Sequence, residues 1–95
     1  MNELEFTWDS QKAQINRQKH GISFEEAQSA FYDENARVIY DPDHSQQEDR
    51  FILLGMSDYY RLLIVCHCYR ENDTIIRIIS ARKANKSEQK QYGEY

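Results

Sequence analysis

The residues that could do chemistry are concentrated in the last third of the chain. His67 lies in an apolar run, Arg77 interrupts an isoleucine-rich run, and Arg82 and Lys83 follow it closely. Cleavage of RNA beside its 2′-hydroxyl needs a group that takes that proton, a group that protonates the leaving 5′-oxygen, and cations near the phosphate. Arginine suits the phosphate because its planar fork holds two oxygens at once. We therefore take His67, Arg77, Arg82 and Lys83 as the candidate catalytic residues.

Further basic and polar side chains lie close to this set in the sequence. Residues 1–50 carry five Lys/Arg against eleven Asp/Glu, a net charge of −6, whereas residues 51–95 carry seven against five, a net charge of +2. This asymmetry lets the second half face an anion, although the whole chain has a net charge of −4. The RNA-binding residues expected from this charge distribution are Arg70, Lys86, Lys90 and Tyr92.

Structural roles compete with these functional ones. A single histidine in an apolar strand is more often a hydrogen-bonded core residue, and a charge inside an isoleucine-rich strand needs a partner or a route to solvent. The other histidines are interpreted as structural, since His20 precedes a helix-ending glycine and His44 lies in an acidic loop. Tyr59 and Tyr60, at a predicted turn, could stack on bases, hold a protein partner or cover a sheet edge.

Two helices are predicted in the first third of the chain. The first begins after an N-cap at position 9 or 10 and ends at Gly21, which can adopt the left-handed conformation that closes a helix. Ser23 and Glu26 have the spacing of a capping box, in which each side chain accepts a hydrogen bond from the other residue's backbone N–H. A second helix is therefore expected from Ser23 onward, close to the first.

The remaining elements are strands and one further helix. The predicted strands are 4–8 at the N-terminus and then 37–40, 50–56, 61–69 and 74–80. The run 61–69 is apolar on both faces and belongs in the middle of a sheet. Tight turns join consecutive strands, which predicts an antiparallel meander of about four strands and brings His67 near Arg77. With a C-terminal helix from about Ser87, the fold class is α+β.

Length and composition restrict the class of protein. A chain of 95 residues with 40% hydrophobic content can bury one core, so we expect residues 1–95 to form a single domain. No apolar run is long enough to span a bilayer and no signal peptide is recognisable, so a cytoplasmic location is expected. Cys66 and Cys68 point to the same face of a strand and fall short of a zinc shell, so we expect reduced thiols, no metal and no cofactor.

Several segments resemble the BrnT family of type II toxins. They are Phe6-Thr7-Trp8-Asp9, Asn16, the KHGISFEEA segment 19–27, Arg50-Phe51 and the RIISARKA segment 77–84. The resemblance covers residues 6–92, and the ordered combination of its motifs is specific. It implies a RelE-like fold, with helices packed against a small antiparallel sheet, and a ribonuclease that arrests translation until an antitoxin occupies it.

The same resemblance extends to individual positions. His67 falls where such sequences have His or Tyr after the apolar strand, and Arg77, Ser80, Arg82 and Lys83 fall in the shared RIISARKA segment. The resemblance thereby adds Ser80 to the expected RNA-binding residues. The general base and the general acid stay open, because the family pattern supplies no fixed pair to transfer. The usual Glu-Arg after the strand is replaced here by Tyr69-Arg70. The family pattern therefore does not indicate which RNA sequences the loop 70–73 would select.

The resemblance also implies a partner. A BrnA-like antitoxin of the ribbon-helix-helix class would bind this chain and would itself bind DNA, so the chain would meet DNA only indirectly. The alternative function is a catalytically weak interaction module that holds such an antitoxin. The acidic net charge of −4 favours that alternative, since nucleases of this kind tend to be basic.

Overall fold

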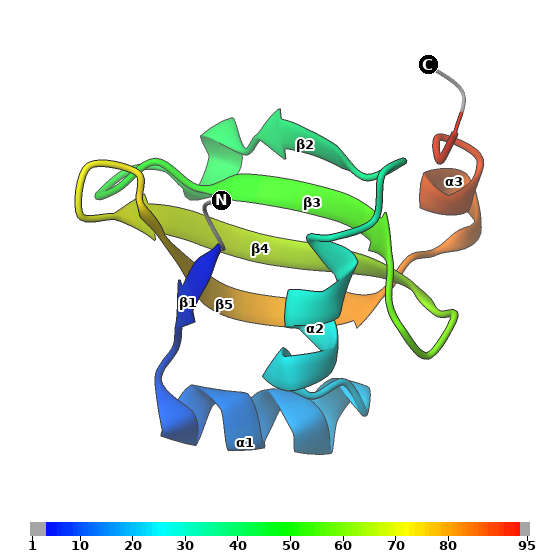
Figure 1. The fold of residues 1–95 in the computed structure, drawn as a ribbon, viewed down its shortest axis with the longest axis horizontal. Coiled ribbons are helices and arrows are strands. Elements are labelled where there is room, and N and C mark those ends of the chain that lie inside the picture. The colour runs from blue at the N-terminus through cyan, green and yellow to red at the C-terminus, as the bar shows by residue number, and fades with distance from the viewer. Residues whose placement is uncertain (1–3, 94–95) are drawn as a thin grey trace.

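A five-stranded sheet, covered by helices on one face, organises the chain. The computed structural model describes residues 4–93, and its strands lie in the order β1-β5-β4-β3-β2 (Figure 1). The strands are β1 (Glu5–Thr7), β2 (Arg37–Tyr40), β3 (Phe51–Met56), β4 (Leu62–Arg70) and β5 (Ile75–Lys83). The helices are α1 (Ser10–His20), α2 (Phe24–Ala30), the short 3-10 helix η1 (Pro42–His44) and α3 (Lys86–Gln89). The α+β prediction is confirmed.

Local signals explain where the first two helices begin and end. Asp9 is the N-cap of α1 and accepts hydrogen bonds from the backbone of Gln11 and Lys12, and Gly21 closes the helix with a φ of 72°. Ser23 caps α2 by accepting from the backbone N–H of Glu26 at 3.0 Å. The second half of the predicted capping box is wrong. The Glu26 carboxylate turns inward to Ser57 and Arg61 and does not return to the backbone of Ser23.

The meander of four antiparallel strands, β2 to β5, is confirmed, and β4 lies in the middle of the sheet. The N-terminal strand β1 joins the other side of β5 in parallel, with Glu5 opposite Ile75 and Thr7 opposite Arg77. The first and last strands of the chain are therefore neighbours. The C-terminal helix is a single turn that begins at Lys86, close to the predicted position.

A β-bulge interrupts the pairing of β4 with β5. Cys66 is opposite Ser80, but the next residue, His67, is opposite Ile78, so Ile79 has no counterpart on β4. An extra residue of this kind shifts the in-and-out alternation of side chains by one position. Arg77, on one side of Ile79, therefore shares a face of the sheet with Ser80 and Arg82 on the other side. In a regular strand it would share a face with residues 79, 81 and 83.

The main core lies between the sheet and α2. Its buried members include Phe24 and Ala27 from the helical segment and Leu53, Val65 and Ile78 from the strands. The opposite face, here called the open face, has no long helix over it among residues 4–93. It is formed by Ile52, Leu54, Ile64, Cys66, Cys68, Arg77, Ser80 and Arg82.

Helix α1 is fixed to the edge of β5 by a buried side chain. Asn16, only 6% exposed, donates from Nδ2 to the carbonyl of Ala81 at 2.9 Å and accepts from the backbone N–H of Ala81 at 3.1 Å. The amide thus makes the two hydrogen bonds that another strand would make beyond the end of β1. It also donates to the carbonyl of Ile22 at 3.0 Å, which ties the turn between the helices to the sheet.

Candidate nucleic-acid interface

The bulge at Ile79 brings Arg77, Ser80 and Arg82 to the open face. Their partners across β4 are Cys68, Cys66 and Ile64, in that order. Lys83 is opposite Leu63, whose side chain belongs to the helix-covered core. Lys83 therefore projects from the helix-covered face and not from the open face. The structure thus separates Lys83 from Arg77, Ser80 and Arg82, the other three predicted site residues of the RIISARKA segment.

Two further arginines join Arg77 around the thiol of Cys68. Burial raises the pKa of Cys68, the carboxylate of Glu48 adds to that rise, and the positive charges of Arg70, Arg50 and Arg77 oppose it. Within residues 4–93 the guanidinium of Arg77 has no hydrogen bond and no ion pair, although it feels the charge of Asp9. Arg77 is therefore available to an external anion.

Glu48 occupies the space between Arg70 and Arg50. Its Oε1 accepts from Nη1 of Arg70 at 2.7 Å, and its Oε2 lies 3.9 Å from Nη2 of Arg50. The hydrogen bond from Arg70 is the main reason that the pKa of Glu48 is lowered from its ordinary value. The Nε of Arg50 is buried with no hydrogen-bond partner among the described residues. Sequence reasoning missed Glu48 and Arg50 as site residues.

Arg82 is paired differently. Its Nη1 and Nη2 each donate to one oxygen of Glu88 at 2.8 Å, which is the two-pronged arrangement that arginine also makes with phosphate. The backbone N–H of Asn85 also donates to the Glu88 carboxylate, and the Asn85 side chain accepts from the backbone N–H of Glu88. Asn85 and Glu88 thus form a capping box at the start of α3. The N-x-x-E spacing of 85–88 would have predicted this cap.

His67 lies inside the protein. Its side chain is 0% exposed, and its ring meets that of Phe31 edge-on at 4.9 Å. Nδ1 lies 3.1 Å from the carbonyl of Val65, which can only accept, so Nδ1 carries the proton and Nε2 accepts from the hydroxyl of Tyr69 at 3.3 Å. Burial lowers the pKa of His67, so the imidazole is neutral. It faces the helix-covered side, away from Arg77.

The remaining predicted contacts lie on the C-terminal segment, which turns back beside the ends of β2 and β3 (Figure 1). Lys86 and Lys90 are exposed. Tyr92 is half-buried, packs against Leu54 and Ile64 and donates a short hydrogen bond to Asp33. Tyr92 thus holds the tail against the sheet, which a sequence pattern alone could not reveal.

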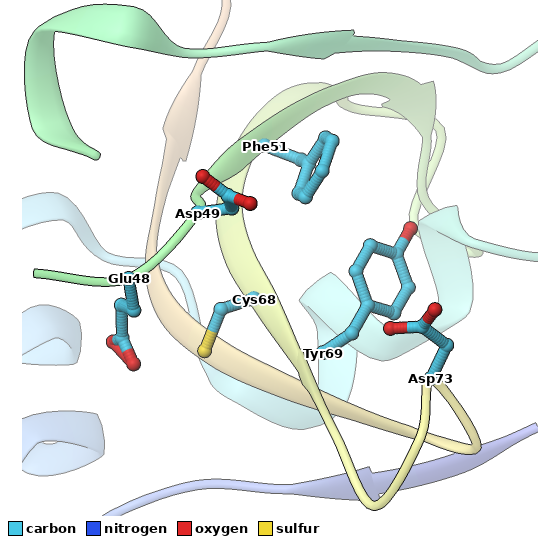
Figure 2. A pocket seen from close by; sticks show the side chains of 6 residues that line it. All are labelled: Glu48, Asp49, Phe51, Cys68, Tyr69 and Asp73. Carbon is cyan, nitrogen blue, oxygen red and sulfur yellow. The ribbon is translucent and has the colours of Figure 1, made fainter.

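A hollow of about 480 Å³ opens at the end of the sheet where β4 extends beyond β3. It is lined by Glu48, Asp49, Phe51, Cys68, Tyr69 and Asp73. Figure 2 shows Glu48 and Cys68 on one side of β4, and Phe51, Tyr69 and Asp73 on the other. The carboxylates of Glu48, Asp49 and Asp73 would repel a phosphate from the interior of the hollow. A phosphate would bind more favourably at its border, next to Arg50 and Arg70.

Two other kinds of site can be assessed from the described residues. Within residues 4–93 no three or more His, Cys, Asp or Glu side chains are grouped so that they could hold a metal ion. None of the helices in that range is both long and apolar enough to cross a membrane.

The fold and the open face define a small α+β domain with an arginine-bearing sheet surface. The sequence model described as "Ribonuclease toxin, BrnT, of type II toxin-antitoxin system" matches residues 8–88, and the chain therefore belongs to the BrnT family. The predicted resemblance is confirmed, and membership of a type II toxin–antitoxin family implies an antitoxin partner.

A solved structure supports the fold independently. The crystal structure of the Brucella abortus ribonuclease toxin BrnT matches with a TM-score of 0.66 and 22% identity, covering 88% of this chain and 100% of that chain. At this identity the likeness shows the fold alone, and RelE-like is a looser description of it. A search of curated proteins found no match.

Proposed function

We propose that this chain is a metal-independent endoribonuclease that cleaves RNA and thereby inhibits translation. The observation that supports it best is the free guanidinium of Arg77, half-buried on the open face beside Arg50 and Arg70. An arginine whose guanidinium has no hydrogen bond or ion pair within residues 4–93 is suited to a phosphate group. Membership of a ribonuclease toxin family makes RNA the expected source of that phosphate.

In this proposal the arginines stabilise the charge that grows on the phosphate when the 2′-oxygen attacks it. Arg77 binds a phosphate directly. Arg70 and Arg82 must first give up their hydrogen bonds to Glu48 and Glu88 before they can bind one. Ser80, two positions before Arg82 and on the same face, adds a hydroxyl donor. Exposed Lys86 and Lys90 extend the basic surface along the RNA.

Two of the predicted catalytic residues receive other roles. His67 is buried and neutral, and within residues 4–93 its Nε2 has the hydroxyl of Tyr69 as its hydrogen-bond partner, so we assign it to the core. Lys83 projects from the helix-covered face, where its charge acts on Glu26. Neither residue is expected to contact the same phosphate as Arg77.

Inducible expression tests the proposal. We expect wild type to arrest growth and degrade RNA, and the Arg77→Ala/Arg82→Ala variant to do neither. Lys12→Ala/Arg17→Ala, which removes two exposed cations from α1, is the matched control and should act like wild type. Equal harm, or equal harmlessness, of wild type and the Arg77→Ala/Arg82→Ala variant would contradict RNA cleavage at the open face.

We further propose a BrnA-like ribbon-helix-helix antitoxin as the partner. Strand β2 supports a protein partner, because all four of its residues are exposed and its outer edge has no strand beside it within residues 4–93. Val38 and Ile39 are 45% and 49% exposed there, and an extended segment can add to such an edge. A partner that binds only the folded chain must also raise its melting temperature.

The same observations favour a second candidate, an interaction module with weak or no cleavage. Glu48 and Glu88 already occupy Arg70 and Arg82, as expected if the open face no longer serves RNA. Co-expression with the protein of the adjacent gene separates the two. A complex that forms while the purified chain alone never degrades RNA would favour the module, and RNA loss that the partner suppresses would favour the toxin.

A further inference from the structure

The proposed cleavage requires a group that takes the proton of the 2′-hydroxyl, and the sequence left that group open. Among the described residues, Glu88 is paired with Arg82 of the open face, and Glu48 is paired with Arg70 at the border of that face. Glu88 has both oxygens bound to Arg82 and also accepts from the Asn85 backbone. Its hydrogen-bonding capacity is therefore largely used within the protein.

Glu48 is placed differently. Only its Oε1 is engaged by a guanidinium at hydrogen-bond distance, while Oε2 is 3.9 Å from Arg50. The nearby thiol of Cys68 adds a small further lowering of the pKa of the carboxylate. The side chain is about one third exposed and lines the hollow, so an RNA sugar can approach it from solvent.

The surroundings of Glu48 also match the other needs of the reaction. Arg70 and Arg50 flank Glu48, and the charges of Glu48 and Arg77 both act on the thiol of Cys68. A phosphate bound by Arg50 and Arg70 would lie beside the carboxylate of Glu48. The Glu48 carboxylate is ionised at neutral pH, which is the form that accepts a proton, while its hydrogen bond from Arg70 lowers its pKa and makes it a weaker base than an ordinary glutamate.

We propose that Glu48 is the general base of this site, an inference that rests on the proposed ribonuclease function. Glu48 takes the proton of the 2′-hydroxyl as the 2′-oxygen forms a bond to phosphorus. The bond from phosphorus to the 5′-oxygen breaks with its electron pair, and that oxygen takes a proton from water. The hydroxide that remains takes the proton from Glu48, which restores the carboxylate. The products are a 2′,3′-cyclic phosphate end and a 5′-hydroxyl end.

A competing role makes the opposite prediction. If Glu48 only neutralises Arg70 and Arg50, removing its charge should free them, strengthen RNA binding and speed cleavage. If Glu48 is the base, removing its charge should strengthen binding but abolish most of the turnover. The two roles therefore differ in the sign of the change in kcat.

The test is steady-state cleavage of a fluorophore–quencher RNA by the purified chain, comparing wild type with Glu48→Gln. Glutamine can still accept the hydrogen bond from Arg70 but is not a base. We expect kcat to fall about 100-fold, the low end of the effect of general acid–base groups, with KM unchanged or lower. Glu48→Asp keeps a carboxylate and should retain more activity than Glu48→Gln, which keeps the comparison valid if one variant folds poorly.

Asp49→Asn is the matched control, because it removes one negative charge from the same hollow without touching Arg70. It should change kcat far less than Glu48→Gln. If wild type cleaves and Glu48→Gln cleaves equally well or faster, Glu48 is not the base, while the ribonuclease proposal stands. If wild type produces no cyclic phosphate ends from any RNA, the ribonuclease proposal fails and this assignment fails with it.

Discussion

Glu88 accepts two hydrogen bonds of 2.8 Å from Arg82 and so fills the fork that would otherwise hold a phosphate. Both residues are partly exposed, so this pair contributes little to stability. If the open face binds RNA as proposed, Glu88 competes with the phosphate for Arg82 and should affect RNA affinity more than the fold.

Glu88→Gln should raise the affinity for RNA. Glutamine can keep the cap on Asn85 but holds Arg82 less tightly, so the guanidinium becomes available to a phosphate. We expect the slope of log K against log salt to steepen by about 1, one additional phosphate contact. Fluorescence anisotropy with a 2′-O-methyl RNA, which cannot be cleaved, measures both quantities. Glu25→Gln on α2 loses the same charge away from the open face, and an equal effect there would refute a local role for Glu88.

Asn16→Ala should destabilise the fold. The change leaves the N–H and the carbonyl of Ala81 buried without the partners that Asn16 supplies. Unsatisfied buried groups cost about 1–3 kcal/mol each, so we expect the free energy of unfolding to drop by about 2–4 kcal/mol. Urea denaturation measures it. Gln18→Ala, an exposed position on the same helix, should stay within about 0.5 kcal/mol of wild type.

Arg61→Met should destabilise the fold because it leaves the buried carboxylate of Glu26 without its positive partner. Glu26 is 4% exposed and accepts from Nε of Arg61 at 2.9 Å and from the hydroxyl of Ser57 at 2.7 Å. Removing Arg61 strands a buried carboxylate, and we expect a loss of about 3 kcal/mol, the low end for such pairs because Arg61 is partly exposed.

A double-mutant cycle on the same pair checks the cause. Glu26→Gln/Arg61→Met removes the stranded charge and should cost less than Arg61→Met alone. Additive losses in the two single variants would mean that the pair does not act as a unit. Thermal and urea unfolding of the four proteins give the required free energies.

Acidification should weaken the fold through His67. Burial lowers its pKa in the folded state below the ordinary 6.5, so the unfolded chain binds a proton that the folded chain does not. The contribution of neutral His67 is complete above pH 6.5 and is lost as the pH falls from 6.5 toward the folded pKa. In that window the free energy of unfolding should decrease by up to about 1.4 kcal/mol per pH unit.

His67→Phe should remove this part of the pH dependence while keeping an aromatic ring next to Phe31. The difference in unfolding free energy between wild type and variant, measured by urea titration at several pH values, isolates the histidine from the carboxylates. His20→Gln, at a more exposed position, is the comparison. A pH-independent difference between wild type and His67→Phe would show that His67 does not titrate on unfolding.

The elements were predictable where short-range chemistry decides them. The side chain of Asp9 caps α1 and the left-handed Gly21 ends it, both from interactions within a few residues. The turns after β3 and β4 likewise follow from local composition, and they give the antiparallel order. The interior placement of β4 follows from its apolar residues on both faces.

The arrangement of the candidate site was not predictable in the same way. The extra residue Ile79 has no distinguishing local pattern, yet it decides that Arg82 shares a face with Arg77 and that Lys83 does not. The pairing of Glu48 with Arg70 depends on how a loop folds back over a distant strand. Such contacts join residues far apart in the chain, and only the assembled sheet determines them.

The parallel pairing of β1 with β5 has a consequence during synthesis of the chain. Glu5 is opposite Ile75, so this pair joins the beginning of the chain to its last strand. While β5 is still inside the ribosomal tunnel, β1 and the edge of β4 have nothing to pair with, and Arg77 and Arg82 have no sheet to hold them in place. The open face can therefore form only after β5 has left the tunnel, so under the proposed function a nascent chain that has not yet exposed β5 would carry no assembled surface for RNA.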